Sequence, residues 1–310
     1  MISARELSAW RPHAPWTSDL MVEQDYLLSK AVAAIFEDRF LKSHVAMRGG
    51  TVLHKGHLAP ASRYSEDIDL VLVGTRPPGD IKKALHRVLR PILGTPSESV
   101  LADLQLAVRN LVAKSKILRT TYTYDPLSSE AAFAHLKVEV NINENRSFFP
   151  LVPIDVQVPD GAGGVRPVPV VSYDLDEMLG TKLRALLQRE HGRDLFDLWW
   201  SWETTQNPAA PARVNPERVG AAFRFYMDQE GSTFKAADVQ RELERRMTSR
   251  KFLADMDGFM PAGQSYSPQR ACEEFCRVFL PHFWQGHAEV GAVGQQSVGV
   301  NISSTRSSSS

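Results

Sequence analysis

VAMRGGTVLHKGHLAPASRYSEDIDLVLV, residues 45–73, is the stretch of this 310-residue chain on which the rest is organised. It opens with an apolar triplet and a Gly-Gly-Thr, passes through a turn-rich helical segment and returns as a strand. In residues 65–73 apolar and polar residues alternate, so that Asp67 and Asp69 share one strand face and Ile68 and Leu70 share the other. We therefore expect a strand that carries a pair of carboxylates on one face.

This pair of carboxylates has the chemistry of a metal site. Two carboxylates side by side on a rigid strand repel each other unless a cation lies between them, which suits hard divalent ions, Mg²⁺ above all. Gly49 and Gly50 let the backbone approach a ligand closely, and the helical segment after them, from Thr51, offers unpaired N–H groups to a phosphate. An edge strand protected by charge is the plainer interpretation of Asp67 and Asp69. Their aliphatic neighbours and the upstream Gly-Gly-Thr count against it.

Composition bounds the class of protein. The 36 Lys and Arg residues equal the 36 Asp and Glu residues, so any RNA binding has to come from a local basic patch. The two cysteines, Cys272 and Cys276, are too few for a disulfide framework and lack the second pair that a zinc site needs, which indicates a reducing cytosol. The N-terminus has no apolar signal segment and no stretch is long enough to span a bilayer, so we expect a cytoplasmic protein.

Hydrophobic periodicity predicts an α+β protein of two domains followed by a tail. A segment rich in Pro, Gly and Val at 150–171 marks the boundary between domain 1–170 and a helical domain at 171–286, with the functional cleft between them. Residues 287–310 are rich in Gly, Ser and Gln and are expected to be disordered. The expected elements are helices at 17–40, 81–92 and 100–114, strands at 65–73, 117–124 and 135–142, a hairpin tip at 160–164, and further helices at 174–189, from 193, 215–229, 235–256 and 268–283.

The motifs occur together in an order that resembles a known family. A Gly-Gly-[Ser/Thr] followed at short distance by Asp-x-Asp is the signature of polymerase-β-like nucleotidyltransferases. With it, the segments RYSEDIDL (63–70), LKVEVN (136–141) and KLRALLQREHGRDLFDL (182–198) closely resemble the AbiEii/AbiGii toxin family of type IV toxin–antitoxin systems, and the related mycobacterial toxins that modify tRNA. The resemblance runs roughly from residue 23 to residue 261. It implies a polymerase-β-like mixed sheet with flanking helices, followed by a helical C-terminal domain.

The resemblance also implies a metal site with three carboxylates. Nucleotidyl transfer uses two Mg²⁺ ions about 3.5–4 Å apart, and Asp67 and Asp69 are the first two ligands. Glu139 is the candidate for the third, on a neighbouring strand, because it is the one acid within the apolar-alternating run at 136–140. The plainer interpretation of Glu139 is a solvated strand face.

Nucleotide-binding residues follow from the same resemblance. Lys182 is expected to bind the triphosphate of an NTP, with Arg189 seven residues on, and Asp194 to orient Lys182 or an active-site arginine. The plainer interpretations are a solvated helix residue for Lys182 and a helix-start acid for Asp194. Ser65 shares the face of Asp67, and its hydroxyl either binds a phosphate or begins the strand.

Several polar residues are given no role in the site. Asp197, one turn after Asp194, has the same interpretations as Asp194 but the weaker motif match. His54, His57 and His191 lack metal-ligand partners at useful spacing, so they are expected to be ordinary polar residues.

The resemblance finally implies a reaction and its partners. The chain is expected to be a monomeric toxin that adds nucleotides from an NTP to the 3′ end of tRNA, blocks translation and is neutralised by a cognate antitoxin. Transfer to a protein hydroxyl is an alternative that uses the same acids but needs no basic groove beside the cleft. A regulatory NTP-binding protein without transfer activity is another, and such a protein would normally have lost one of the acids that this chain keeps.

Overall fold

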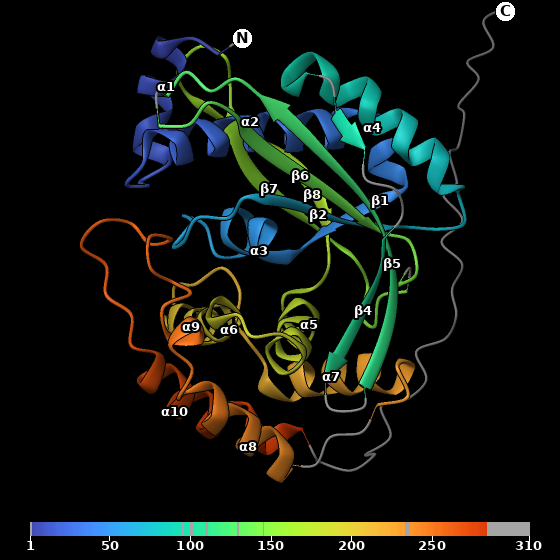
Figure 1. Cartoon of the computed structure of the whole chain (residues 1–310), viewed down its shortest axis with the longest axis vertical. Helices are drawn as coiled ribbons and strands as arrows, with labels where there is room; N and C mark the ends of the chain where they lie inside the picture. Colours follow the sequence, from blue (N-terminus) through green and yellow to red (C-terminus); the bar gives the residue numbers. More distant parts are fainter. Residues whose placement is uncertain are drawn as a thin grey trace, which may run out of the picture.

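The computed structural model of the chain is built on one mixed sheet, covered by helices on both faces (Figure 1). The structure describes residues 2–94, 96–98, 102–108, 111–128, 130–144, 146–232 and 236–283. The tail at 287–310, predicted to be disordered, lies outside these residues. The sheet with flanking helices confirms the predicted α+β class.

Eight strands of the described residues form the sheet, in the order β3-β5-β6-β2-β1-β8-β7, with β4 paired to β5. The β2–β6 and β1–β8 pairs are parallel, and the other pairs are antiparallel. The strands are β1 (Val45–Arg48), β2 (Asp67–Leu72), β3 (Pro96–Glu98), β4 (Ala102–Val108), β5 (Leu111–Tyr124), β6 (Ala134–Asn141), β7 (Val152–Pro159) and β8 (Val165–Ser172).

The helices lie on the two sides of this sheet. Figure 1 shows α2 and α4 on one side and α5, α6 and α7 on the other. No helix within the described ranges has the length and apolar character that crossing a bilayer requires. The helices are α1 (Ala4–Trp10), α2 (Asp19–Glu37), α3 (Gly49–Val52) with a π-helical turn (Leu53–His57), α4 (Pro78–Leu93), α5 (Leu175–Gln188), α6 (Gly192–Thr205), α7 (Pro216–Gln229), α8 (Ala236–Arg246), α9 (Arg250–Leu253) and α10 (Pro268–Val278).

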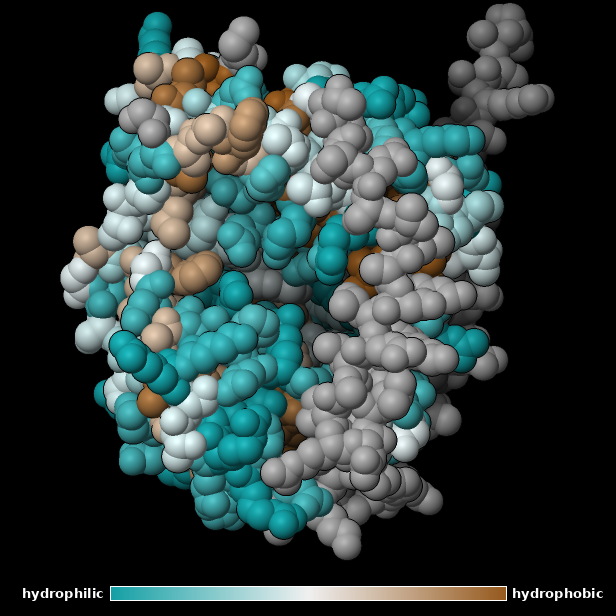
Figure 2. All heavy atoms as spheres, viewed as in Figure 1, coloured by the Kyte–Doolittle hydropathy of each residue, from teal (hydrophilic) through white to brown (hydrophobic). Residues whose placement is uncertain are grey.

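The alternation in β2 determines which face of the strand is acidic. Ile68 and Leu70 are buried, in the same core as Leu28 and Ile35 of α2. Asp67 and Asp69 therefore point to the other side of the sheet, where α5 lies. The core continues into the C-terminal helices, whose outer surface is largely hydrophilic in Figure 2. Their core residues include Met178, Leu179, Leu183, Leu195, Leu198, Val219 and Phe223.

Two of the predicted helices are wrong. Within the segment predicted as a helix at 100–114, the described residues 102–108 and 111–114 form β4 and the start of β5, which pair antiparallel from Ala102↔Ile117 to Val108↔Leu111. Leu104, Leu106 and Val108 recur every second residue, which is the period of a strand. The helix prediction is wrong because a short apolar run is compatible with both the helical and the strand period. The helix predicted at 235–256 is two helices, because Ser249 caps the start of α9 by accepting a hydrogen bond from the Phe252 N–H.

A glycine of α5 allows close packing against α7. A Cβ on Gly180 would lie 2.8 Å from Ala222 Cβ and 2.9 Å from the backbone nitrogen of Phe223. Gly180→Ala should therefore lower the free energy of unfolding by about 1–3 kcal/mol, measured by denaturant titration. Gly79→Ala is the control, because a Cβ in that first turn of α4 meets nothing within 4 Å. Equal stability of the two variants would contradict this account of the packing.

Candidate active site

The turn after β1 lies directly against the acidic face of β2. Gly49 has a φ of 85°, and a Cβ there would lie 2.1 Å from Oδ2 of Asp69. A Cβ on Gly50 would lie 3.0 Å from the hydroxyl of Ser65. The Thr51 hydroxyl donates to the backbone carbonyl of Asp67 (2.6 Å) and lies 2.9 Å from the Ser65 hydroxyl. The two glycines are thus required here for close approach, and the turn and the acidic strand form one unit.

Four charged residues stand in register across the sheet and form what we call the charged row. Arg48 of β1 is opposite Asp69 of β2, Asp69 is opposite Glu139 of β6, and Glu139 is opposite Arg119 of β5. Side chains of residues in register on neighbouring strands point to the same face. Arg119 Nε donates to Glu139 Oε1 at 2.7 Å. Two adjacent carboxylates are therefore flanked by two guanidinium groups.

The third acid, Asp67, lies on the same face with its own cation. Asp67 is in register with Lys137 of β6, and Lys137 Nζ lies 3.2 Å from Asp67 Oδ1. Burial opposes the charge on Lys137, yet the Asp67 carboxylate raises its pKa overall. The structure thus brings Asp67, Asp69 and Glu139 to one face of two adjacent strands.

The electrostatics of Asp69 are those of a crowded carboxylate. Burial raises its pKa to about 6, with further contributions from the Glu139 and Asp67 charges, while Arg48 and Lys182 oppose the rise. A cation beside Asp69 would relieve this repulsion, and carboxylate oxygens are the ligands that Mg²⁺ prefers. The donor set therefore fits a divalent cation.

Two of the acids are nevertheless already paired with cations. Within the described part of the chain, no three His, Cys, Asp or Glu side chains are gathered closely enough to hold a metal ion. Asp67 and Glu139 instead hold Lys137 and Arg119. A metal bound by all three acids would have to displace these two cations.

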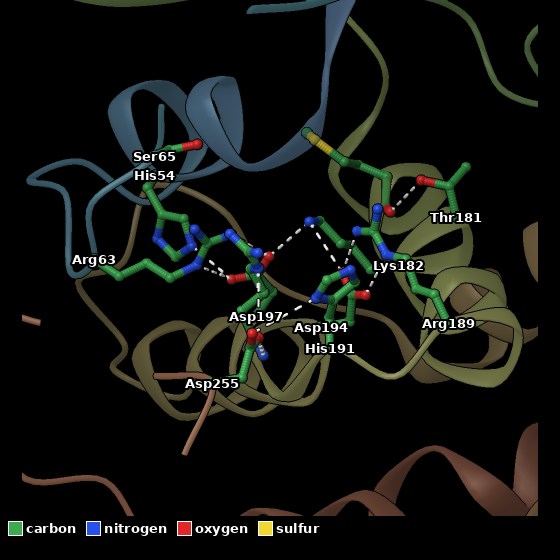
Figure 3. A network of polar contacts seen from close by, with 12 residues as sticks. His54, Arg63, Ser65, Thr181, Lys182, Arg189, His191, Asp194, Asp197 and Asp255 are labelled. Atoms are coloured by element: carbon green, nitrogen blue, oxygen red, sulfur yellow. Dashed lines mark hydrogen bonds and ion pairs between the residues drawn. The ribbon is translucent and has the colours of Figure 1, made fainter. Parts of the chain in front are cut away.

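Lys182 stands between two buried carboxylates of α6 (Figure 3). Its side chain is 8% exposed, and Nζ lies 3.3 Å from Asp194 Oδ1 and 2.8 Å from Asp197 Oδ2. Arg189 binds Asp194 with two hydrogen bonds of 2.8 Å. Burial alone would raise the pKa of Asp194, but Arg189 and Lys182 lower it to about 2. Asp194 thus contacts both cations that the sequence suggested for it.

Asp197 is the residue of this site that sequence reasoning underrated. It is fully buried and accepts two hydrogen bonds from Arg63, at 2.6 and 2.7 Å, and one contact of 2.8 Å from His54. Burial would raise its pKa, but Arg63, Lys182 and His54 hold it well below the usual range. The i, i+3 spacing of Asp194 and Asp197, which puts both on one helix face, was the available signal.

His54 and His57, expected to be ordinary polar residues without a role in metal binding, are both buried. Burial lowers the pKa of His54 to about 4, although Asp197 opposes the shift, so the ring is neutral at pH 7. A carboxylate can only accept, so Nε2 carries the proton that faces Asp197, and Nδ1 accepts from the Ser62 hydroxyl at 3.0 Å. His54 thereby ties the segment before β2 to α6.

The two clusters, one on the sheet and one on α5 and α6, meet at Asp69. The charge of Lys182 opposes the rise in the pKa of Asp69, and Asp69 together with Asp194 raises the pKa of Arg189. The charges of Lys182 on α5 and of Arg189, which follows this helix, therefore act on the acidic face of the sheet. His191 lies outside this meeting point, 3.6 Å from Asp255.

The neutral state of His54 predicts a specific pH dependence of stability. Its pKa falls from 6.5 to about 4 on folding, so between these values the unfolded chain binds a proton that the folded chain does not, and stability falls as pH falls. His54→Gln removes this titration, so its unfolding free energy should depend less steeply on pH by about 1.4 kcal/mol per pH unit in that window. Denaturant titrations at several pH values measure the slope. Parallel curves for the two proteins would contradict a neutral, buried His54.

Comparison with known proteins places the chain in a family. No curated protein matches it. Among solved structures, JHP933 from Helicobacter pylori is similar at 15% identity over 86% of this chain and 93% of that one, with a TM-score of 0.47. MenT4, a nucleotidyltransferase toxin from Mycobacterium tuberculosis H37Rv, is similar at 16% identity over 90% and 96% of the two chains, with a TM-score of 0.44. The family model for the nucleotidyl transferase AbiEii toxin of type IV toxin–antitoxin systems matches residues 30–282. Because this match spans most of the chain, the protein belongs to the AbiEii nucleotidyltransferase toxin family.

Proposed function

We propose that this nucleotidyltransferase toxin transfers nucleotides from an NTP to the 3′ end of tRNA in a Mg²⁺-dependent reaction and thereby blocks translation. The observation that carries the proposal is the meeting of an acidic strand face, Asp67 and Asp69, with the cations Lys182 and Arg189 beside a glycine turn. A metal–triphosphate complex needs both kinds of group, oxygen ligands for the metal and cations for the phosphates. We further propose that the chain acts as a cytoplasmic monomer. Membership of the family implies an antitoxin partner.

The acids of the sheet would hold the metal. Asp67, Asp69 and Glu139 are its proposed ligands, for two ions as the resemblance implies. When bound, Mg²⁺ makes the α-phosphate more electrophilic and the acceptor hydroxyl more acidic. In the proposed reaction the acceptor oxygen bonds to the α-phosphorus, the bond to the leaving pyrophosphate breaks, and the hydroxyl proton passes to water.

The turn and α5 would hold the nucleotide. The backbone of Gly49 and Gly50, which no side chain separates from Asp69 and Ser65, would approach the phosphates closely, and the hydroxyls of Thr51 and Ser65 lie at the same place. Lys182 and Arg189 would stabilise the charge that develops on the leaving pyrophosphate.

The carboxylates of α6 position these cations. Asp194 holds Lys182 and Arg189, and Asp197 holds Lys182 and Arg63. Because Asp194 and Asp197 are fully buried, they orient the cations without touching the substrate. We place the division between the nucleotidyltransferase domain (1–170) and the helical domain (171–286) where the sheet ends and α5 begins, so that the Arg63–Asp197 ion pair crosses it.

The acceptor is tested by supplying each labelled NTP in turn, with Mg²⁺, to the purified protein in the presence of total tRNA and of a cell protein extract. Label on the tRNA supports the proposal. Label on protein would favour the alternative of protein nucleotidylation. Label on neither, with NTP still bound, would favour a regulatory NTP-binding protein.

Asp69→Asn should abolish transfer, because it removes a proposed metal ligand. It should not lower stability, because ionising Asp69 opposes folding as pH rises through its raised pKa of about 6. The readouts are label transfer and the midpoint of thermal unfolding at pH 8 without metal. Asp155→Asn, at an exposed acid of β7, is the matched control and should keep full activity. Transfer by Asp69→Asn at the wild-type rate would refute the metal role.

Lys182→Met should reduce the rate roughly 10²–10³-fold at saturating acceptor, since it removes one charge that stabilises the leaving pyrophosphate. The Met side chain replaces the aliphatic stem of the lysine in the packing. A thermal unfolding curve shows whether the variant is folded at the temperature of the assay. Lys83→Met, at an exposed lysine of α4, is the control. Normal turnover by Lys182→Met at low NTP would show that this lysine has only a structural role.

A further inference from the structure

Each carboxylate on the acidic face of the sheet has a cationic residue in register with it. Asp67 is in register with Lys137, Asp69 with Arg48, and Glu139 with Arg119. All six side chains come from four adjacent strands. A divalent cation that enters this face alone therefore meets two carboxylates, Asp67 and Glu139, that are already paired with cations.

The three cations differ in how firmly they are held. Arg48 is 17% exposed and its Nη1 donates to Glu144 at 2.6 Å, and Glu144 is itself bound by Arg184. The side chains of Lys137 and Arg119 are 42% and 33% exposed. Arg48 is held by this chain of largely buried ion pairs, whereas the long side chains of Lys137 and Arg119 are more exposed and can turn their charged heads toward solvent.

We infer that Arg119 and Lys137 are exchangeable counter-cations of the metal site, which neutralise Glu139 and Asp67 until a divalent cation replaces them and then bind the phosphates of the NTP. The inference rests on the proposed function. Its physical basis is that the metal and the two side chains compete for the same carboxylate oxygens. Once displaced, each cation is left beside a site that now carries excess positive charge, which an anionic triphosphate neutralises.

The consequence is that metal and triphosphate bind together. A free metal that breaks the two ion pairs leaves the displaced cations without a partner. A metal that arrives with phosphate gives these cations a new partner. Removing one of the two cations should therefore change the two affinities in opposite directions. Partly exposed ion pairs are worth about 0.2–1 kcal/mol, which corresponds to changes of roughly 1.4- to 5-fold.

The test measures both affinities separately in the folded protein. Electron paramagnetic resonance gives the Kd for free Mn²⁺, and fluorescence titration gives the Kd for a fluorescent, non-hydrolysable NTP analogue at saturating Mn²⁺. The variants are Arg119→Gln and Lys137→Gln. Arg119→Lys keeps the charge, and Arg166→Gln breaks an exposed ion pair with Glu37 on α2, away from the site.

Arg119→Gln and Lys137→Gln should each bind free Mn²⁺ several-fold more tightly than the wild type and the analogue several-fold more weakly. Arg119→Lys and Arg166→Gln should behave as the wild type. A purely structural role would lower both affinities together, and that result, or unchanged Mn²⁺ affinity, would overturn the inference while leaving the proposed function intact. A wild-type protein that binds no Mn²⁺ even with the analogue would overturn the metal requirement of the proposed function and this inference with it.

Discussion

The ion pairs of Asp197 join the sheet and the helices of this enzyme into one site. Its carboxylate has no exposed surface and holds Arg63 from the segment before β2 and Lys182 from α5. Removing one partner from such a buried group typically costs 3–5 kcal/mol, because the other charge is left unpaired. The relative placement of the acidic strand and the lysine therefore depends on this one side chain on α6.

A second constraint is the repulsion within the acidic face. Asp69 and Glu139 stand in register on adjacent strands, and the raised pKa of Asp69 reflects its burial and its crowding. The fold tolerates this arrangement because Arg48, Arg119 and Lys137 surround the acids. A crowded set of carboxylates with a perturbed pKa is typical of a functional site, and its counter-ions are consistent with the proposed binding of a cation.

Local chemistry explains why much of the site could be predicted. The alternation in 65–73 places Asp67 and Asp69 on one strand face. The alternation in 136–140 places Glu139 on the strand face opposite to that of its aliphatic neighbours Val138 and Val140. The Gly-Gly-Thr turn has a local reason too, because Gly49 adopts a positive φ that disfavours other residues. The prediction failed at 100–114, where a short apolar run is compatible with both helical and strand periods and the pairing of β4 with β5 selected the strand.

The sequence by itself determined the α+β class, the acidic strand, the glycine turn and the helix that carries Lys182, since each depends on residues near one another in the chain. Only the tertiary structure decided that Arg119 and Arg48 flank the acids, because strand register links residues that no local period relates. It also decided that Asp197 binds Arg63, a contact across 134 positions of sequence. Burial and ion pairing depend on what the fold places around a side chain. Asp197 would be an ordinary solvated acid if α6 had packed with its other face inward.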